Sequence, residues 1–271
     1  MRHKAIGVYD SGFGGLSVWR ELRRMLPDES LTYLGDGKNC PYGGRSRDEI
    51  TRFAVQAVER LLENGVKMVV VGCNTATTAA IEHLRSRWPE LPIVGLEPAV
   101  KPACLTTRTR KIAVLATEHS LRSDMFLRTA SRYADDVEVV KVVGHDFVEI
   151  VESGQEHTPR AERAVREAVE PLVGMGVDKI VLGCTHYPFL RPLIERVVEG
   201  YGIDVIDSGE AVARRVKWLL DRYDIAQIKG ATPQLRFLSF ADDDYVCRLR
   251  SKATAIDEQL HATAVLTKSN L

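Results

Sequence analysis

Two cysteines stand in nearly the same local sequence, far apart in a chain of 271 residues. The first lies in Gly72-Cys73-Asn74-Thr75 and the second in Gly183-Cys184-Thr185-His186. A cysteine can act as a base or nucleophile where a helix N-terminus or a polar partner lowers the pKa of its thiol. A single cysteine behind a strand glycine is more often a small buried residue. Its recurrence with threonine nearby favours one site that uses two thiols.

Similar elements must position the two cysteines. Each follows a short β-branched apolar run, over residues 68–71 or 180–182, and precedes residues suited to starting a helix. Both cysteines are therefore predicted at the carboxyl ends of buried parallel strands, where open α/β sheets bind ligands. Their separation, 184 − 73 = 111 residues, is too long for a local metal-binding motif and suits a duplicated lobe.

The order of predicted strands and helices begins again near Lys111. Ser11 precedes Cys73 by 73 − 11 = 62 residues, and Thr117 precedes Cys184 by 184 − 117 = 67. This repeat predicts an α/β fold of two pseudosymmetric lobes, each with a mostly parallel sheet flanked by helices, and an active site in the cleft between them. The predicted strands cover residues 5–9, 31–34, 68–72, 93–96, 112–116, 137–143, 179–183, 203–206 and 235–240.

We expect the first lobe to comprise residues 1–97 plus 208–252 and the second to comprise residues 98–207. Residues 253–271 are expected to form a peripheral C-terminal tail, because their mix of polar and small residues offers little material for a core.

Composition and charge narrow the class of protein. The 37 basic and 37 acidic side chains cancel, so we expect no nucleic-acid partner and no attraction to an acidic membrane. The first apolar run has only about five residues, too few for a secretory signal or a membrane span, which predicts a cytoplasmic protein. Five cysteines without a C-x-x-C pair argue against a disulfide framework and against a metal site.

Polar residues near the predicted strand ends add candidate functional groups. Asp10 and His186 could assist proton transfer, although either could be an ordinary turn or strand-end residue. The glycine run at residues 12–15 fits neither the dinucleotide fingerprint nor the P-loop, but its backbone N–H groups could hold a carboxylate. The loop at residues 41–44 could present backbone groups to a ligand or be a simple surface turn.

Four segments together resemble those of glutamate racemases: Asp10-Ser11-Gly12-Phe13-Gly14-Gly15, Pro41-Tyr42-Gly43, Cys73-Asn74-Thr75-Ala76 and Gly183-Cys184-Thr185-His186-Tyr187-Pro188. The resemblance covers residues 5 to about 250. The Cys-Asn-Thr segment alone would indicate only the wider aspartate/glutamate racemase superfamily. The second cysteine segment, together with Pro-Tyr-Gly, is the specific part.

This resemblance implies interconversion of L- and D-glutamate without a cofactor, supplying D-glutamate for peptidoglycan. It implies that Cys73 takes the α-proton from D-glutamate and Cys184 takes it from L-glutamate, with Asp10 and His186 assisting. The implied substrate-binding residues are Ser11, Pro41, Tyr42, Gly43, Asn74, Thr75 and Thr185. A homodimer is also compatible with the resemblance. Inverting a stereocentre requires an acid and a base on opposite faces, and two like groups suit a reaction that runs in both directions.

The chain departs from the family pattern around two segments. His119 stands where glycine is common and Ser120 where threonine is common, which weakens Thr117 and Ser120 as ligands. The segment at residues 144–146 replaces a common Ala-Cys-Pro, which leaves Glu152 as a candidate acid outside direct contact with the substrate.

Other classes of protein fit part of this pattern. A racemase for aspartate or another amino acid would share the fold. A cysteine hydrolase or phosphatase would use Cys184 and His186, but Arg191 stands one position too far for a C-x5-R phosphate loop. A two-lobed amino-acid-binding protein would account for the duplication and leave the paired thiols without a role.

Overall fold

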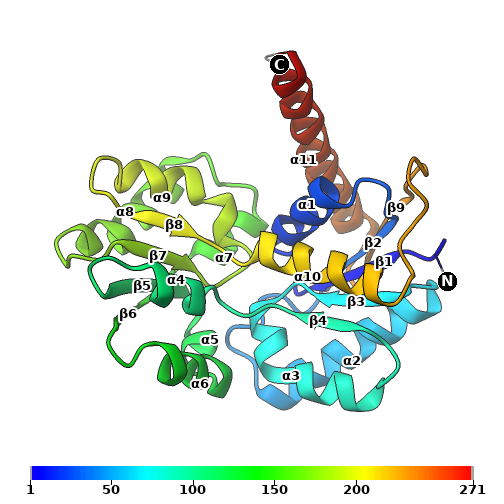
Figure 1. Cartoon of the computed structure of the whole chain (residues 1–271), viewed down its shortest axis with the longest axis horizontal. Coiled ribbons are helices and arrows are strands. Elements are labelled where there is room, and N and C mark those ends of the chain that lie inside the picture. Colours follow the sequence, from blue (N-terminus) through cyan, green and yellow to red (C-terminus); the bar gives the residue numbers. More distant parts are fainter. Residues whose placement is uncertain (1, 270–271) are drawn as a thin grey trace.

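The computed structural model describes residues 2–269, which form two all-parallel sheets in two lobes that lie side by side (Figure 1). Sheet A has the order β4-β3-β1-β2-β9, and sheet B has the order β6-β5-β7-β8. Sheet A contains β1 (Ile6–Asp10), β2 (Leu31–Gly35), β3 (Met68–Val71), β4 (Ile93–Gly95) and β9 (Leu235–Ser239); sheet B contains β5 (Lys111–Ala116), β6 (Glu138–Val143), β7 (Lys179–Leu182) and β8 (Asp204–Ile206). Each predicted strand is present, and the predicted two-lobed α/β fold is confirmed.

The two sheets have the same topology. Read from the opposite edge, sheet B runs β8-β7-β5-β6, which repeats β4-β3-β1-β2 of sheet A, and β9 is an addition to the edge. The strand β3 that leads to Cys73 therefore corresponds to the strand β7 that leads to Cys184. This equivalence gives the two thiols matched positions at strand ends.

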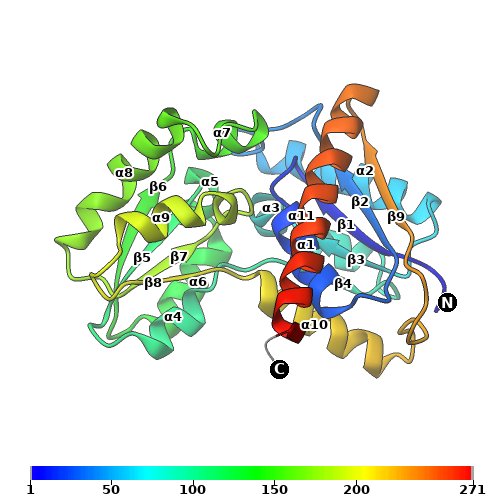
Figure 2. The same ribbon diagram turned by 90° about the horizontal axis from the view of Figure 1, so that it is seen from above.

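Helices cover both faces of each sheet (Figure 2). Around sheet A lie α1 (Leu16–Met25), α2 (Arg47–Glu63), α3 (Asn74–Arg87), α10 (Gly209–Arg222) and α11 (Asp243–Ser269). Around sheet B lie α4 (Val100–Thr106), α5 (Glu118–Arg122), α6 (Asp124–Tyr133), α7 (Phe147–Glu152), α8 (Pro159–Val173), the 3-10 turn η1 (Tyr187–Phe189) and α9 (Arg191–Val197). No helix within residues 2–269 is both long and apolar enough to cross a membrane.

Local sequence signals fix several helix boundaries. Ser46 and Glu49 form a capping box at the start of α2, and Thr158 caps α8 immediately before Pro159. Between residues 118 and 133 the chain forms two helices, α5 and α6, because Ser123 ends α5 and caps α6 through its side chain. Thr117 consequently caps a short helix of its own.

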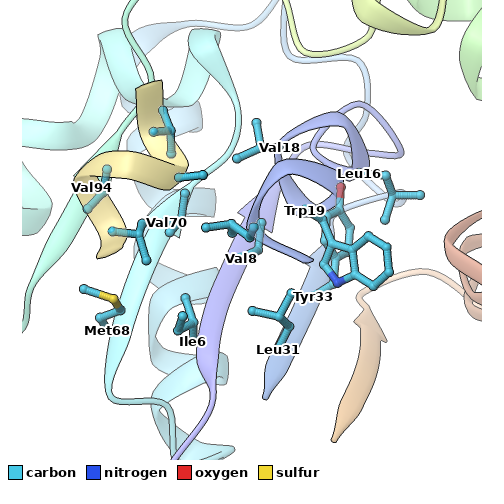
Figure 3. Close-up of a cluster of buried hydrophobic side chains, with 14 of the residues drawn as sticks. Ile6, Val8, Leu16, Val18, Trp19, Leu31, Tyr33, Met68, Val70 and Val94 are labelled. Atoms are coloured by element: carbon cyan, nitrogen blue, oxygen red, sulfur yellow. The ribbon is translucent and has the colours of Figure 1, made fainter. Parts of the chain in front are cut away.

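Apolar side chains fill both faces of sheet A. On one face, strand residues such as Val8 and Val70 belong to one core with Trp19 of α1 (Figure 3). Helices α2 and α3 supply a second core on the other face. Such cores hold the strand ends in place, because close-packed interiors deform little.

The C-terminal segment differs from the prediction of a peripheral tail after residue 252. Helix α11 continues to Ser269, and its outer part extends away from both sheets (Figure 1). Ala253 and Ile256 are buried in the core beside α1, and Asp257 pairs with Arg23 at 3.0 Å. The prediction was wrong because scattered small apolar residues suffice for a helix that packs on one narrow face. Residues 270 and 271 lie outside the described part of the chain.

We propose lobe boundaries near residues 98 and 208. The chain passes from β4 of sheet A to β5 of sheet B after the first, and from β8 to α10 after the second.

Candidate active site

Residues from the strand ends of both lobes meet in one site. The Thr185 hydroxyl donates to Asp10 Oδ2 at 3.0 Å, and the Ser17 hydroxyl donates to the Thr185 carbonyl at 2.9 Å. The backbone N–H of Phe13 donates to Glu152 Oε1 at 2.7 Å. Each of these hydrogen bonds joins one lobe to the other, so the predicted strand-end residues of the two repeats face one another.

Cys73 lies at the N-cap of α3 with 4% of its surface exposed. Its sulfur accepts from the Ala76 N–H at 3.4 Å and donates to Ser11 Oγ at 3.5 Å. Burial raises the pKa of Cys73 to about 12, aided by the negative charge of Asp10, although both hydrogen bonds act to lower it. The expectation that the helix N-terminus would lower the pKa of this thiol was therefore wrong, because desolvation outweighs the cap. Cys73 rests as a neutral thiol.

Cys184 occupies the matching position after β7, with 7% of its surface exposed. His186 Nδ1 lies 3.7 Å from its sulfur. Cys73 contacts Ser11, and Thr185, the next residue after Cys184, donates to Asp10, the residue before Ser11. The predicted pair of thiols is thus brought together by the fold.

His186 and Glu152 form a charged pair beside Cys184. His186 Nε2 lies 2.6 Å from Glu152 Oε1, and the histidine side chain is almost fully buried. Burial alone would lower the pKa of His186, but its contacts with Cys184 and Glu152 raise it well above the usual range. Burial acts to raise the pKa of Glu152, but hydrogen bonds from His186 and the Phe13 backbone hold it below its ordinary value. An imidazolium is therefore stabilised next to Cys184.

Asp10 is fully buried at the end of β1, and both of its carboxyl oxygens accept hydrogen bonds. Oδ1 accepts from the Gly12 N–H at 2.8 Å, and Oδ2 accepts from Thr185. Burial raises the pKa of Asp10 to about 6, although His186 and the Gly12 N–H act to lower it. The negative charge of Asp10 raises the pKa of Cys73, and His186 lowers the pKa of Asp10, so Asp10 interacts with both halves of the site.

Hydroxyl groups from both lobes cluster beside α3. Thr75 Oγ1 lies 3.3 Å from Thr117 Oγ1 and 3.5 Å from Ser120 Oγ, and Thr117 donates to Ser120 at 3.0 Å. The two contacts of Thr75 join the lobe of sheet A to the lobe of sheet B through hydroxyl groups alone. Serine in place of threonine at position 120 thus keeps a hydroxyl in this cluster, and Thr117 supplies a second one.

Asn74 presents an unsatisfied polar group within the site. It is 4% exposed, and its amide Nδ2 is buried without a hydrogen-bond partner among the described residues. A buried amide donor without an acceptor costs free energy, on the order of 1–3 kcal/mol. A ligand oxygen would relieve that cost.

The loop that carries residues 41–43 is tied to the end of β1. The Tyr42 hydroxyl donates to Asp36 Oδ2 at 2.6 Å and lies 2.7 Å from the Tyr9 hydroxyl. The Asp36 N–H in turn donates to the Asp10 carbonyl at 2.9 Å. Because its hydroxyl is used within the protein, Tyr42 can offer a ligand its backbone, as can Gly43 next to it. Pro41 follows a cis peptide bond after Cys40.

The glycine run lets the two lobes approach closely. A Cβ on Gly12 would lie 2.7 Å from Glu152 Cδ, and one on Gly14 would lie 2.6 Å from Thr185 Oγ1. Within the protein, the Phe13 N–H of this run donates to the Glu152 carboxylate.

Two cavities flank the loop at residues 36–45. One cavity, of about 520 Å³, has a lining that includes Cys40, Pro41, Gly144, Glu152, Tyr245 and Arg248. The other, of about 470 Å³, is lined by Gly43, Gly44 and helices of both lobes, and contains four arginines against three carboxylates: Arg45, Arg47, Arg122, Arg128, Glu82, Glu118 and Asp124. The second cavity therefore offers an anion a favourable approach.

Some residues of the site carried no recognisable signal in the sequence. Tyr245 of α11 donates to Glu152 Oε2 at 3.2 Å, and Asp36 anchors Tyr42. Asp36 precedes a Gly- and Pro-rich loop, which is a weak pointer, whereas nothing around Tyr245 distinguishes it. Within the described residues, no group of three or more His, Cys, Asp or Glu side chains is arranged to hold a metal ion.

Comparison with known proteins agrees with this geometry. Residues 7–216 match the family model described as Asp/Glu/Hydantoin racemase, and the chain belongs to this family. Within it, the chain belongs to the glutamate racemases: it is 46% identical to the glutamate racemase of Ectopseudomonas mendocina over 226 residues, covering 83% of this chain and 86% of the relative.

Solved structures give the same assignment. A glutamate racemase isoform of Bacillus anthracis superposes with a TM-score of 0.82 at 30% identity, covering 94% of this chain and 95% of the other. The Escherichia coli glutamate racemase, solved in complex with L-glutamate and an activator, gives a TM-score of 0.80 at 28% identity, covering 92% and 95%.

Proposed function

We propose that this protein interconverts L- and D-glutamate by moving the α-proton between two cysteines, without a cofactor. The observation that carries this proposal is the placement of Cys73 and Cys184 at equivalent strand ends of two pseudosymmetric lobes, with both sulfurs turned to one site. Two acid–base groups on opposite sides of a carbon are what inversion by proton transfer requires.

The reaction from L-glutamate begins with a thiolate at Cys184 and a thiol at Cys73. The imidazolium of His186, with Nδ1 3.7 Å from the Cys184 sulfur, is placed to stabilise that thiolate, whereas burial raises the pKa of Cys73. In this state the Cys184 thiolate takes the α-proton of L-glutamate and Cys73 delivers its own proton to the opposite face, giving D-glutamate. The enzyme is left with a Cys184 thiol and a Cys73 thiolate, which is the state that accepts D-glutamate. Asp10 and His186 assist the proton transfers at the two cysteine sulfurs.

Substrate charges are matched by groups already in place. Asn74 Nδ2 has no partner in the described part of the chain and can donate to a carboxylate oxygen, while Thr75 and Thr117 bring their hydroxyls together and Thr185 places its own against Asp10. Ser11 and the backbone of Tyr42 and Gly43 complete the set. Preorganised donors of this kind stabilise the negative charge that develops when the α-proton leaves. The substrate ammonium, close to a buried thiol, favours its thiolate form.

Glutamate is preferred over aspartate because the relatives that match over most of the chain are glutamate racemases. The arginine-rich cavity beside Gly43 suits an approaching dicarboxylate of either length. A cysteine hydrolase is less well supported, since it would leave Cys73 without a role.

The deciding experiment is proton NMR of L-glutamate incubated with the purified protein in D₂O without added cofactor, combined with polarimetry. Loss of the α-proton signal together with decay of optical rotation supports the proposal. No change with glutamate but a response with aspartate would transfer the proposal to aspartate. No change with either amino acid would refute it.

We further propose that the protein acts in the cytoplasm, where its product would enter peptidoglycan synthesis, and that it forms a homodimer. Sedimentation velocity at micromolar concentration tests the dimer. A single species at the monomer mass would refute it.

A further inference from the structure

Tyr245 lies on the C-terminal helix α11, outside the repeated elements that carry the other site residues. It is 7% exposed and belongs to the core formed by α1, α10 and α11. Its hydroxyl nevertheless leaves that core and donates to Glu152 Oε2, on α7 of the other lobe, at 3.2 Å.

The two carboxyl oxygens of Glu152 are held from different directions. Oε1 accepts from the Phe13 N–H and contacts His186 Nε2, whereas Oε2 accepts from Tyr245. A carboxylate fixed at both oxygens cannot rotate about its terminal bond without losing a hydrogen bond. The orientation of Oε1 toward His186 therefore depends on the contact at Oε2.

The ring of Tyr245 is confined on several sides, which fixes where its hydroxyl points. It packs on the Phe13 ring with centroids 4.8 Å apart, and the Arg248 guanidinium lies 5.4 Å from its centroid. On another side it lies so close to Gly37 that a Cβ there would be 2.7 Å from Tyr245 Cδ2. Gly37 begins the loop that carries the Pro-Tyr-Gly segment. Tyr245 thus contacts Phe13 of the glycine run, Gly37 of the loop at residues 36–45, and Glu152 of the opposite lobe.

We propose that Tyr245 is a positioning residue for the Cys184 half of the reaction, acting through Glu152 and His186. This inference rests on the proposed function, in which Cys184 exchanges protons with the substrate. Tyr245 orients Glu152, Glu152 orients the imidazole, and the imidazole stabilises the sulfur 3.7 Å away. Because α11 follows β9 of sheet A and Glu152 belongs to the lobe of sheet B, this chain of contacts spans both lobes.

The kinetic test uses Tyr245→Phe, which keeps the ring and removes the hydroxyl. We expect kcat to fall about three- to tenfold, the range for the net loss of one ordinary hydrogen bond, while KM for glutamate stays within about twofold. Tyr223→Phe is the control, because Tyr223 is a largely exposed tyrosine at the end of α10. Because the two enantiomers have equal free energies in solution, kcat/KM must be equal in both directions for every variant, which checks the data.

A double-mutant cycle separates positioning from a general loss of stability. In a Glu152→Gln background, adding Tyr245→Phe should change kcat by less than about twofold, because the residue through which Tyr245 acts has already been altered. Independent, multiplying effects would overturn the inference. An unchanged kcat in Tyr245→Phe, with or without a lower melting temperature, would also overturn it and leave the hydroxyl a structural role alone.

A readout without substrate keeps this inference distinct from the proposed function. The imidazole ¹⁵N signals of His186, assigned by their loss in His186→Asn, should shift in Tyr245→Phe and remain unchanged in Tyr223→Phe. Unshifted signals would overturn the inference even in an active racemase. If the signals shift in Tyr245→Phe but the wild-type protein does not racemise glutamate, the positioning role is supported and the proposed reaction is refuted.

Discussion

Replacing Gly14 by alanine should remove activity by keeping the lobes apart. Gly14 lies in the turn before α1, and a Cβ there would lie 2.6 Å from both Thr185 Oγ1 and His186 Cε1. Unstrained contacts between carbon and its neighbours lie near 3.5–4.0 Å, so the opposing groups must retreat by about 1 Å. His186 is buried and held by Glu152, which leaves it little room to move.

The cost depends on how the clash is relieved. If the lobes stay closed, the added methyl overpacks the site, at about 1–3 kcal/mol of folding stability. If they move apart, stability is kept, but His186 and Thr185 shift relative to the groups of the first lobe. Misplacement of catalytic groups by about 1 Å can cost about 100-fold in rate. Both routes lower kcat/KM, and we expect a loss of about 100-fold.

The assay is the initial rate of racemisation followed by circular dichroism, together with thermal unfolding of the same samples. Gly44→Ala is the matched control, because a Cβ at Gly44 meets no atom within 4 Å, and it should retain wild-type rates and stability. A folded Gly14→Ala protein with full activity would refute the close approach of the lobes as a requirement. Equal losses in both variants would indicate a general sensitivity to alanine.

Four other substitutions test the site. Cys73→Ala or Cys184→Ala should abolish racemisation with the far-ultraviolet dichroism unchanged, since a small residue fits either strand end; full activity in either variant would contradict a two-thiol reaction. Asn74→Ala should raise KM for glutamate about tenfold and leave the melting temperature within a few degrees, because its amide donor has no partner to lose; an unchanged KM would remove Asn74 from the substrate site. Burial raises the pKa of Asp10 to about 6. Between about pH 4 and pH 6 the folded protein therefore holds a proton that the unfolded chain has released, so the free energy of unfolding falls as pH rises, by up to about 3 kcal/mol. Urea unfolding should show this slope in the wild type and lose it in Asp10→Asn, and equal slopes would refute the assignment.

The sequence determined the repeat and the places of the two thiols. Short β-branched runs ending in Gly-Cys identify strand ends wherever they occur, because alternation and turn residues are local properties. The same holds for the capping box at Ser46 and the cap at Thr158, which depend on residues three positions apart or fewer. The family motifs likewise led to Asp10, Asn74 and His186, which the fold brings to one site.

Only the tertiary structure decided the charge states and the contacts between lobes. The helix N-terminus at Cys73 predicted a lowered pKa, but burial by distant segments reversed the sign, and desolvation is not encoded within a local window. Tyr245 meets Glu152 across 93 positions of sequence, and Gly14 faces His186 across the lobe interface. Such juxtapositions arise from how two sheets pack against each other, and packing is set by the sum of many weak contacts along the whole chain.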